Sequence, residues 1–178
     1  MENGEELENQ GENITETVDT SNGKTYRNEE YGYEVKHPRN WTLRSDDETK
    51  ASLNSPENEK YFKEVQKGNG WAYSHDIIIS YYDSVEDIVS SVTPTETIDE
   101  LIETKITARL VEKKMLAGEE AWFVLKSGYG AYYSIYVQHS GHVYEIFFGK
   151  DIIDPEITLF EDSLSEEEKD ILDSFSFL

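Results

Sequence analysis

The sequence predicts an α+β fold, an α/β/α sandwich in which a central antiparallel sheet is covered by helices on both faces. Three observations support this prediction. Two pairs of alternating apolar segments are joined by short glycine turns, which is the pattern of β-hairpins. The second pair carries apolar residues on both faces, so its sheet needs cover on both sides. Helix-start signals at several points of the chain supply that cover.

The chain begins with an acidic segment, residues 1–23, that holds seven acidic residues, no basic residue and no aromatic residue. Such a segment buries too little apolar surface to offset its ordering entropy. We therefore expect a disordered acidic leader, followed by a single folded domain over residues 24–178. The leader is not a signal peptide, because it lacks a basic start and an apolar stretch. It is typical of a secreted bacterial lipoprotein with its anchor upstream, or of a cytoplasmic protein with a ragged N-terminus.

Strand signals follow the leader. In residues 31–37, Tyr31, Tyr33 and Val35 alternate with Gly32, Glu34 and Lys36. Pro38 ends the strand because proline cannot donate to a ladder. Short strands are expected at residues 41–44 and 51–53. Residues 77–82 are apolar on both faces, which favours a central strand.

Helix signals lie between and after these strands. Ser55-Pro56 begins one predicted helix, and Ser84 begins a shorter one. Residues 97–100 and 165–168 form capping boxes, in which a serine or threonine and a glutamate three residues later satisfy the first backbone donors of a helix. The closing residues 174–178 alternate as in a final strand.

The two predicted hairpins turn at Ala117-Gly118 and Ser140-Gly141. Their strands cover residues 109–116 and 120–126, then 131–138 and 142–149. Strands joined by such short turns run antiparallel.

Composition excludes several classes of function. The chain has 178 residues, a formal net charge of -22 and no cysteine. A surface this negative repels nucleic acid and anionic lipid. Without cysteine there is no disulfide, thiol nucleophile or iron–sulfur cluster. No apolar run approaches the roughly 18 residues of a membrane span, so we expect no nucleic-acid partner and no direct membrane insertion.

Two motifs and one turn carry a family resemblance. The opening motif is Tyr-Gly-Tyr-Glu-Val-Lys-His-Pro-Arg-Asn-Trp at residues 31–41, and the closing motif is Ile-Leu-Asp-Ser-Phe-Ser-Phe at residues 171–177. Between them lies the glycine turn of residues 116–121. This arrangement resembles PsbP-like domains, which share their fold with the Ran-regulating Mog protein, and it extends over residues 25–178.

The resemblance implies an α/β/α sandwich on an antiparallel sheet. It also implies a binding or assembly role, since known members are mainly non-enzymatic. Bacterial members are commonly secreted or lipid-anchored, whereas plant and cyanobacterial members are accessory subunits of the oxygen-evolving photosystem. Those subunits dock through basic patches, so the acidity of this chain argues against the photosystem role and favours a lipoprotein-type member.

Residues of catalytic type give no enzyme signature. There is no G-x-S-x-G, G-x-G-x-x-G or Walker motif. His139 and His142 flank a turn, where we interpret them as solvated, and His37 is interpreted as a packing residue. Two acidic loops, residues 46–48 and 151–156, lack the spacing of a calcium-binding loop. We therefore assign no catalytic, cofactor-binding or metal-binding residue and no cofactor.

Aromatic residues offer the remaining candidate site, since the chain has 12 tyrosines and 3 tryptophans. Tyrosine and tryptophan are favoured in binding surfaces as rigid amphipathic contacts. The candidate binding surface consists of Trp71, Tyr73, Tyr129, Tyr132 and Tyr136. The alternative is that these rings cover the sheet and only their hydroxyls reach solvent.

The sequence thus predicts a non-catalytic, extracytoplasmic, lipoprotein-type PsbP-like module that binds a protein or cell-envelope component. We expect the protein to be secreted, or to be held at the membrane by a lipid anchor upstream. The alternatives are a hydrolase using an acidic pair in a sheet-edge cleft, a weak calcium or cation-binding protein, and a cytoplasmic location.

Overall fold

The computed structural model describes residues 17–18, 23–47, 49–68, 76–88, 97–104, 106, 108–127, 130–150 and 160–178. Within these ranges the chain forms two antiparallel sheets, one of seven strands and one of four.

The large sheet has the strand order β4-β5-β6-β10-β9-β8-β7. The bounds of its strands are β4 (Thr42–Asp47), β5 (Lys50–Asn54), β6 (Ile77–Tyr82), β7 (Ala108–Leu116), β8 (Glu119–Ser127), β9 (Ala131–His139) and β10 (His142–Phe148). Both edge strands carry an irregularity in register, β4 between Arg44 and Asp47 and β7 between Leu110 and Glu112. Such bulges shorten the regular part of a sheet edge.

The small sheet has the order β1-β2-β3-β11. Its strands are β1 (Thr17–Val18), β2 (Gly23–Asn28), β3 (Tyr33–Pro38) and β11 (Ser176–Phe177). β11 pairs with β3, with Phe177 opposite Tyr33, so the closing motif completes a sheet begun by the opening motif. Thr17 and Val18, inside the expected leader, pair with β2.

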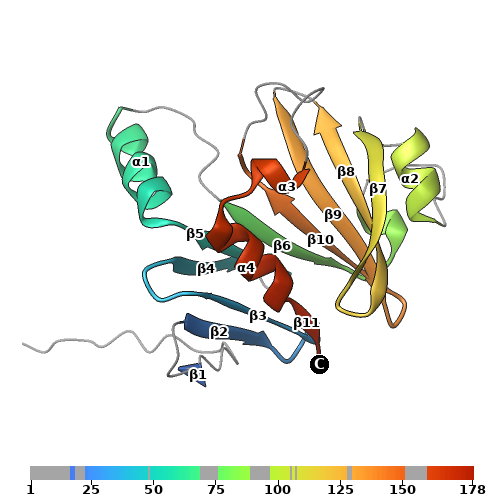
Figure 1. Cartoon of the computed structure of the whole chain (residues 1–178), viewed down its shortest axis with the longest axis horizontal. Coiled ribbons are helices and arrows are strands. Elements are labelled where there is room, and N and C mark those ends of the chain that lie inside the picture. The colour runs from blue at the N-terminus through green and yellow to red at the C-terminus, as the bar shows by residue number, and fades with distance from the viewer. Residues whose placement is uncertain are drawn as a thin grey trace, which may run out of the picture.

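The main core lies between the two sheets. The small sheet and the helices α3 (Phe160–Ser163) and α4 (Glu166–Ser174) cover one face of the large sheet, which we call the inner face (Figure 1). Phe160 contacts rings of three neighbouring strands, with centroid distances of 5.0 Å to Phe123, 5.1 Å to Tyr133 and 5.5 Å to Phe148. These edge-to-face contacts fix α3 on the sheet.

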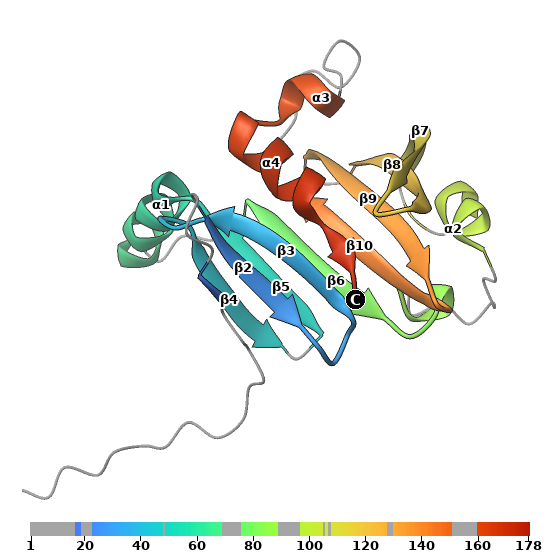
Figure 2. The ribbon, with the colours of Figure 1, turned by 60° about the horizontal axis from the view of Figure 1, so that its bottom comes forward.

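A second, smaller core lies on the opposite, outer face. There the 3-10 helix η1 (Val85–Ile88) and α2 (Ile98–Thr104) pack on Trp122, Val124, Tyr136 and Val143. In Figure 2, α4 and α2 lie on opposite sides of the strands β8 to β10. The apolar character of both faces of β9 and β10 is explained by these two cores.

The prediction of an α+β fold on an antiparallel sheet is confirmed, and helices lie on each face. Helices supply only part of the cover, however. The second sheet, formed by the opening and closing motifs, covers much of the inner face, as Tyr26, Tyr33 and Val35 belong to the main core.

The two hairpin turns and the capping box that the sequence predicts are present in the structure. Ala117 and Gly118 have φ angles of 52° and 89°, and Ser140 and Gly141 have the same two values, as two-residue hairpin turns of type I′ require. The Ser165 side chain accepts from the backbone N–H of Glu168, whose carboxylate accepts from the backbone N–H of Ser165. This reciprocal pair is the predicted capping box of α4.

The helix α1 (Pro56–Lys67) follows β5 directly. Ser55 caps it, with its Oγ 3.2 Å from the backbone nitrogen of Asn58. Arg44 of β4 holds the helix, because its guanidinium lies 2.8 Å from Glu59 and 5.3 Å from the ring centroid of Phe62. The helix therefore lies against the edge of the large sheet.

Candidate functional site

Two of the five predicted binding residues lie in the described part of the chain; Trp71, Tyr73 and Tyr129 lie outside it. Tyr132 and Tyr136 both belong to β9 and direct their rings to the outer face. Tyr132 is half-buried, and its ring centroid lies 5.6 Å from that of Phe147. Tyr136 is fully buried, so its hydroxyl serves contacts within the protein.

The Tyr136 hydroxyl donates to a buried carboxylate. Glu145 of β10 is only 6% exposed, and it is not among the residues that the sequence singled out. Its Oε1 lies 3.0 Å from the Tyr136 hydroxyl, 2.8 Å from Ser134 Oγ and 2.9 Å from Lys126 Nζ. Its Oε2 accepts from the Tyr82 hydroxyl at 3.2 Å. Side chains from β6, β8, β9 and β10 thus meet at one carboxylate.

The network keeps its tyrosines protonated. Burial and the adjacent Glu145 carboxylate raise the pKa of both Tyr82 and Tyr136 far above the usual value for tyrosine. Both phenols therefore remain donors, and the Lys126 ammonium balances the buried charge. Oε1 accepts three of these hydrogen bonds and Oε2 accepts one, and a buried carboxylate satisfied in this way has a structural role.

Above this network lies a partly exposed surface of the large sheet. We call it the outer-face patch and define it as Lys126, Tyr132 and Phe147. Lys126 keeps 31% of its side chain exposed while its ammonium contacts Glu145. The same ammonium lies 6.0 Å from the centroid of the Phe147 ring. A cation and two aromatic rings are thus held together on a rigid sheet.

A signal for this site was present in the sequence. Glu145 interrupts an otherwise apolar strand between Tyr144 and Ile146. A carboxylate in such a position is either solvent-facing or paired inside the protein. Its partners come from other strands, so only the register of the sheet identifies them.

A cleft of about 590 Å³ lies between the N-terminal ends of α1 and α4. Its walls include the carboxylates of Glu57, Asp76, Glu167 and Glu168. Two of these carboxylates accept hydrogen bonds from backbone N–H groups. Asp76 accepts from the Ser55 N–H, and Glu168 accepts from the Ser165 N–H. Asp76 and Glu168 therefore position the starts of the two helices, so they are unlike the free acidic pair of a hydrolase.

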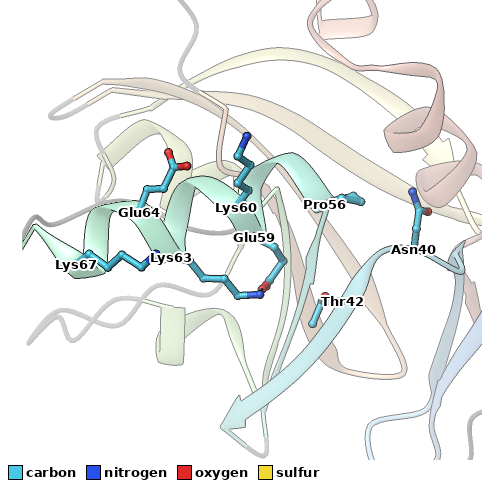
Figure 3. Close-up of a pocket in the computed structure, with 8 residues that line it drawn as sticks. All are labelled: Asn40, Thr42, Pro56, Glu59, Lys60, Lys63, Glu64 and Lys67. Atoms are coloured by element: carbon cyan, nitrogen blue, oxygen red, sulfur yellow. The ribbon is translucent and has the colours of Figure 1, made fainter.

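A groove of about 470 Å³ runs between α1 and β4 (Figure 3). Asn40 and Thr42 line it on the strand side, and Lys60, Lys63 and Lys67 line it on the helix side. Pro56, Glu59 and Glu64 complete its lining. Three lysine ammonium groups therefore line one groove of a protein whose net charge is -22.

A third cavity, of about 340 Å³, lies between the β7–β8 hairpin and the helices α3 and α4. It is lined by apolar side chains such as Met115, Phe123 and Leu172. The ion pair between Lys114 and Glu161, 2.7 Å long, lies at its border.

The two turn histidines have separate partners. His139 Nδ1 lies 2.8 Å from Glu119 Oε1, and its ring stacks on Phe177 at 4.1 Å. His142 Nδ1 lies 2.7 Å from the Tyr81 hydroxyl. No group of three histidine, aspartate or glutamate side chains in the described ranges is arranged to hold a metal ion. The side chains of residues 46–48, and residues 151–156, lie outside the description.

His37 is buried at 2% exposure, and its Nδ1 lies 3.1 Å from the Pro38 carbonyl oxygen. It occupies an interior position of the small sheet. Among the helices that the structure describes, none has the length and apolar composition needed to cross a bilayer.

No family model and no curated protein matches the sequence. Among solved structures, the chain is similar to the solution structure of cyanobacterial PsbP (CyanoP) from Synechocystis sp. PCC 6803. The two chains share 12% identity, the match covers 90% of this chain and 95% of that one, and the TM-score is 0.45. The similarity concerns the fold alone.

Proposed function

We propose that this chain is a non-catalytic binding module that recognises a protein or cell-envelope partner through the outer-face patch. The observation that carries the proposal is the half-buried pair of Tyr132 and Phe147 beside Lys126. Rigid aromatic rings next to a cation are typical of contact residues at protein interfaces. The carboxylate beneath them orients Lys126 and leaves no free acid for catalysis at this place.

The test is affinity capture from the envelope fraction of the source cells, with the whole chain as bait. Replacing Tyr132 and Phe147 by serine should remove the captured partner, because it deletes both rings and leaves the buried carboxylate in place. The matched control is Met115→Ala, which truncates a side chain that is 68% exposed on β7. Equal capture by the wild-type chain and the Tyr132/Phe147 variant would contradict the proposal.

We also propose that the module lies outside the cytoplasm, held by a lipid anchor upstream. Its support is the acidic composition of residues 1–23 together with the resemblance of the two motifs. Fractionation of the source cells provides the test. Recovery of the native protein in the cytoplasmic fraction would contradict this location.

A further inference from the structure

We propose that the groove between α1 and β4 is a docking site for an extended acidic segment of a partner protein, which adds to the edge of β4 as a further strand. This site is separate from the outer-face patch. It is built from a basic helix face and an open strand edge.

The helix side of the groove supplies the charge. Lys60, Lys63 and Lys67 are all exposed, and their spacing places them on one face of α1. Lys63 lies 4.0 Å from Glu59, whereas Lys60 and Lys67 have no ion-pair partner in the part of the chain that the structure describes. Glu59 and Glu64 also line the groove, but Glu59 is paired with Arg44 at 2.8 Å, so the three lysines outnumber the remaining carboxylate. Salt screens charges beyond about 8 Å at physiological ionic strength, so a ligand inside the groove responds to these nearby charges more than to the net charge.

The strand side supplies backbone groups. β4 pairs with β5 along one edge, and no strand lies along its other edge in the described ranges. Such an edge presents backbone N–H and C=O groups that an added strand satisfies. The regular part of β4, Thr42 to Arg44, precedes the irregularity in register, spans about 7 Å and enters the lining of the groove at Thr42.

The spacing of the lysines suits an extended peptide. From Lys60 to Lys67 the helix rises about 10 Å, so the lysines extend beyond the roughly 7 Å of the regular part of β4. In an extended peptide, alternate side chains repeat every 6.6–6.8 Å or so, and Lys63 and Lys67 are about 6 Å apart along the helix axis. A segment with an acidic residue at every second position therefore brings successive carboxylates near successive lysines.

The groove is already formed before any ligand binds. The Arg44–Glu59 ion pair, 2.8 Å long, fixes α1 against β4, and Glu59 keeps only 13% of its side chain exposed. Figure 3 shows Thr42 below the helix that carries the lysines, and Asn40 beyond the Pro56 end of that helix. A preformed site avoids the entropy of ordering on binding.

A polypeptide fits this groove better than a nucleic acid. A nucleic-acid backbone lacks the alternating N–H and C=O groups that pair with a strand edge. A long polyanion also meets repulsion from the rest of a chain whose net charge is -22. The favoured ligand is thus a short, extended, acidic peptide segment.

The test measures binding of a fluorescent ten-residue peptide of alternating glutamate and threonine to the whole chain by anisotropy. Saturable binding is expected, and changing Lys60, Lys63 and Lys67 to glutamate should weaken it about tenfold or more. The matched control changes Lys36, Lys50 and Arg109 to glutamate, which alters the net charge equally at exposed positions outside the groove. This control should bind within about twofold of wild type. If the charge-reversed groove variant fails to fold, glutamine replaces lysine at the same three positions.

Two further ligands test the strand addition. A peptide with proline in place of threonine keeps the charges but lacks alternate N–H donors, and it should bind about tenfold more weakly. A single-stranded DNA decamer should bind more weakly than the parent peptide. Equal binding of the proline peptide or of the DNA would overturn the proposal, as would equal binding by the groove variant. The Tyr132/Phe147 variant should bind the peptide normally, so this test and the test of the outer-face patch fail separately.

Discussion

Tyr136 and Glu145 lie directly opposite each other on β9 and β10, and the tyrosine hydroxyl donates to the carboxylate across 3.0 Å. The pair is buried: Tyr136 has no exposed surface and Glu145 is 6% exposed. A charge at such a position is tolerated because Lys126 and three hydroxyl donors satisfy it. The outer face of the sheet is therefore organised around one carboxylate.

The first prediction concerns this carboxylate. Glu145→Ala should lower the free energy of unfolding by about 2–3 kcal/mol, because it leaves Ser134 and Tyr136 as buried donors without an acceptor. Chemical denaturation measures the change. Glu103→Ala, at an exposed position of α2, is the control and should change stability by less than about 0.5 kcal/mol. Similar values for the two variants would show that the network contributes little.

The second prediction compares two buried tryptophans. Trp122 Nε1 donates to Asp99 Oδ1 at 2.9 Å, and Lys113 Nζ lies 4.7 Å from its ring centroid. Trp41 is buried at 4% exposure, and its Nε1 has no acceptor among the described residues. Trp122→Phe should therefore cost about 1 kcal/mol more than Trp41→Phe. Thermal melts measure both, and an equal loss would contradict the role of Asp99.

The signals that predicted the fold correctly were local ones. Ala117-Gly118 and Ser140-Gly141 fix hairpins through backbone conformation alone, and the Ser165 capping box fixes the start of α4. The small sheet was harder to predict, because the pairing of Phe177 with Tyr33 joins residues far apart in the sequence. The closing alternation predicted a strand but carried no information about its neighbour.

The candidate site was predictable only in part, for the same reason. The aromatic composition points to Tyr132 and Tyr136, and β9 places both on the outer face. Whether such a ring is exposed depends on what packs over it. Tyr136 is covered in the second core, whereas Tyr132 is half-exposed beside Phe147. Glu145 was missed because its donors come from three other strands.

The third prediction tests the turn between β9 and β10. Gly141 has a φ of 89°, a conformation that side chains rarely adopt, so Gly141→Ala should destabilise the protein by about 1–2 kcal/mol. The control is Gly68→Ala, where an added Cβ meets only the Val65 carbonyl oxygen, at 3.6 Å. That variant should change stability by less than about 0.5 kcal/mol. Denaturant titration of the two variants decides the matter, and equal effects would contradict the turn assignment.

The fourth prediction concerns alkaline pH. Desolvation by burial and the hydrogen bond to Asp83 raise the pKa of Tyr81 from 10.0 to about 12. The fold therefore favours the neutral phenol. The contribution of Tyr81 to stability is complete below pH 10 and is lost as pH rises to about 12.

Absorbance titration of the phenolates provides the measurement. Tyr82 and Tyr136 have pKa values raised still further by burial and Glu145, so phenolate absorbance should appear together with unfolding. Tyr81→Phe should make stability less dependent on pH between 10 and 12. An unchanged pH dependence in this variant would argue against the contribution of Tyr81.

The fifth prediction concerns salt and calcium, and it follows from the acidic surface near the C-terminus. Residues 161–162 and 166–168 are all acidic, and the whole chain has a net charge of -22. The structure relieves part of this repulsion: Lys114 lies 2.7 Å from Glu161, Lys169 lies 2.8 Å from Glu166, and Glu168 is used in the capping box. The remaining repulsion is spread over an exposed surface, where counterions screen it.

Moderate sodium chloride should therefore raise the melting temperature, because screening of the net charge outweighs the loss of a few exposed ion pairs that are each worth little. Calcium at equal ionic strength should add only a small further gain, since diffuse screening needs no particular coordination. Thermal melts in the two salts at matched ionic strength make the comparison. A calcium-specific rise in melting temperature of more than about 5 °C would mean stabilisation of roughly 1–2 kcal/mol by a defined binding site. Calcium would then stabilise the protein by coordination and not by screening.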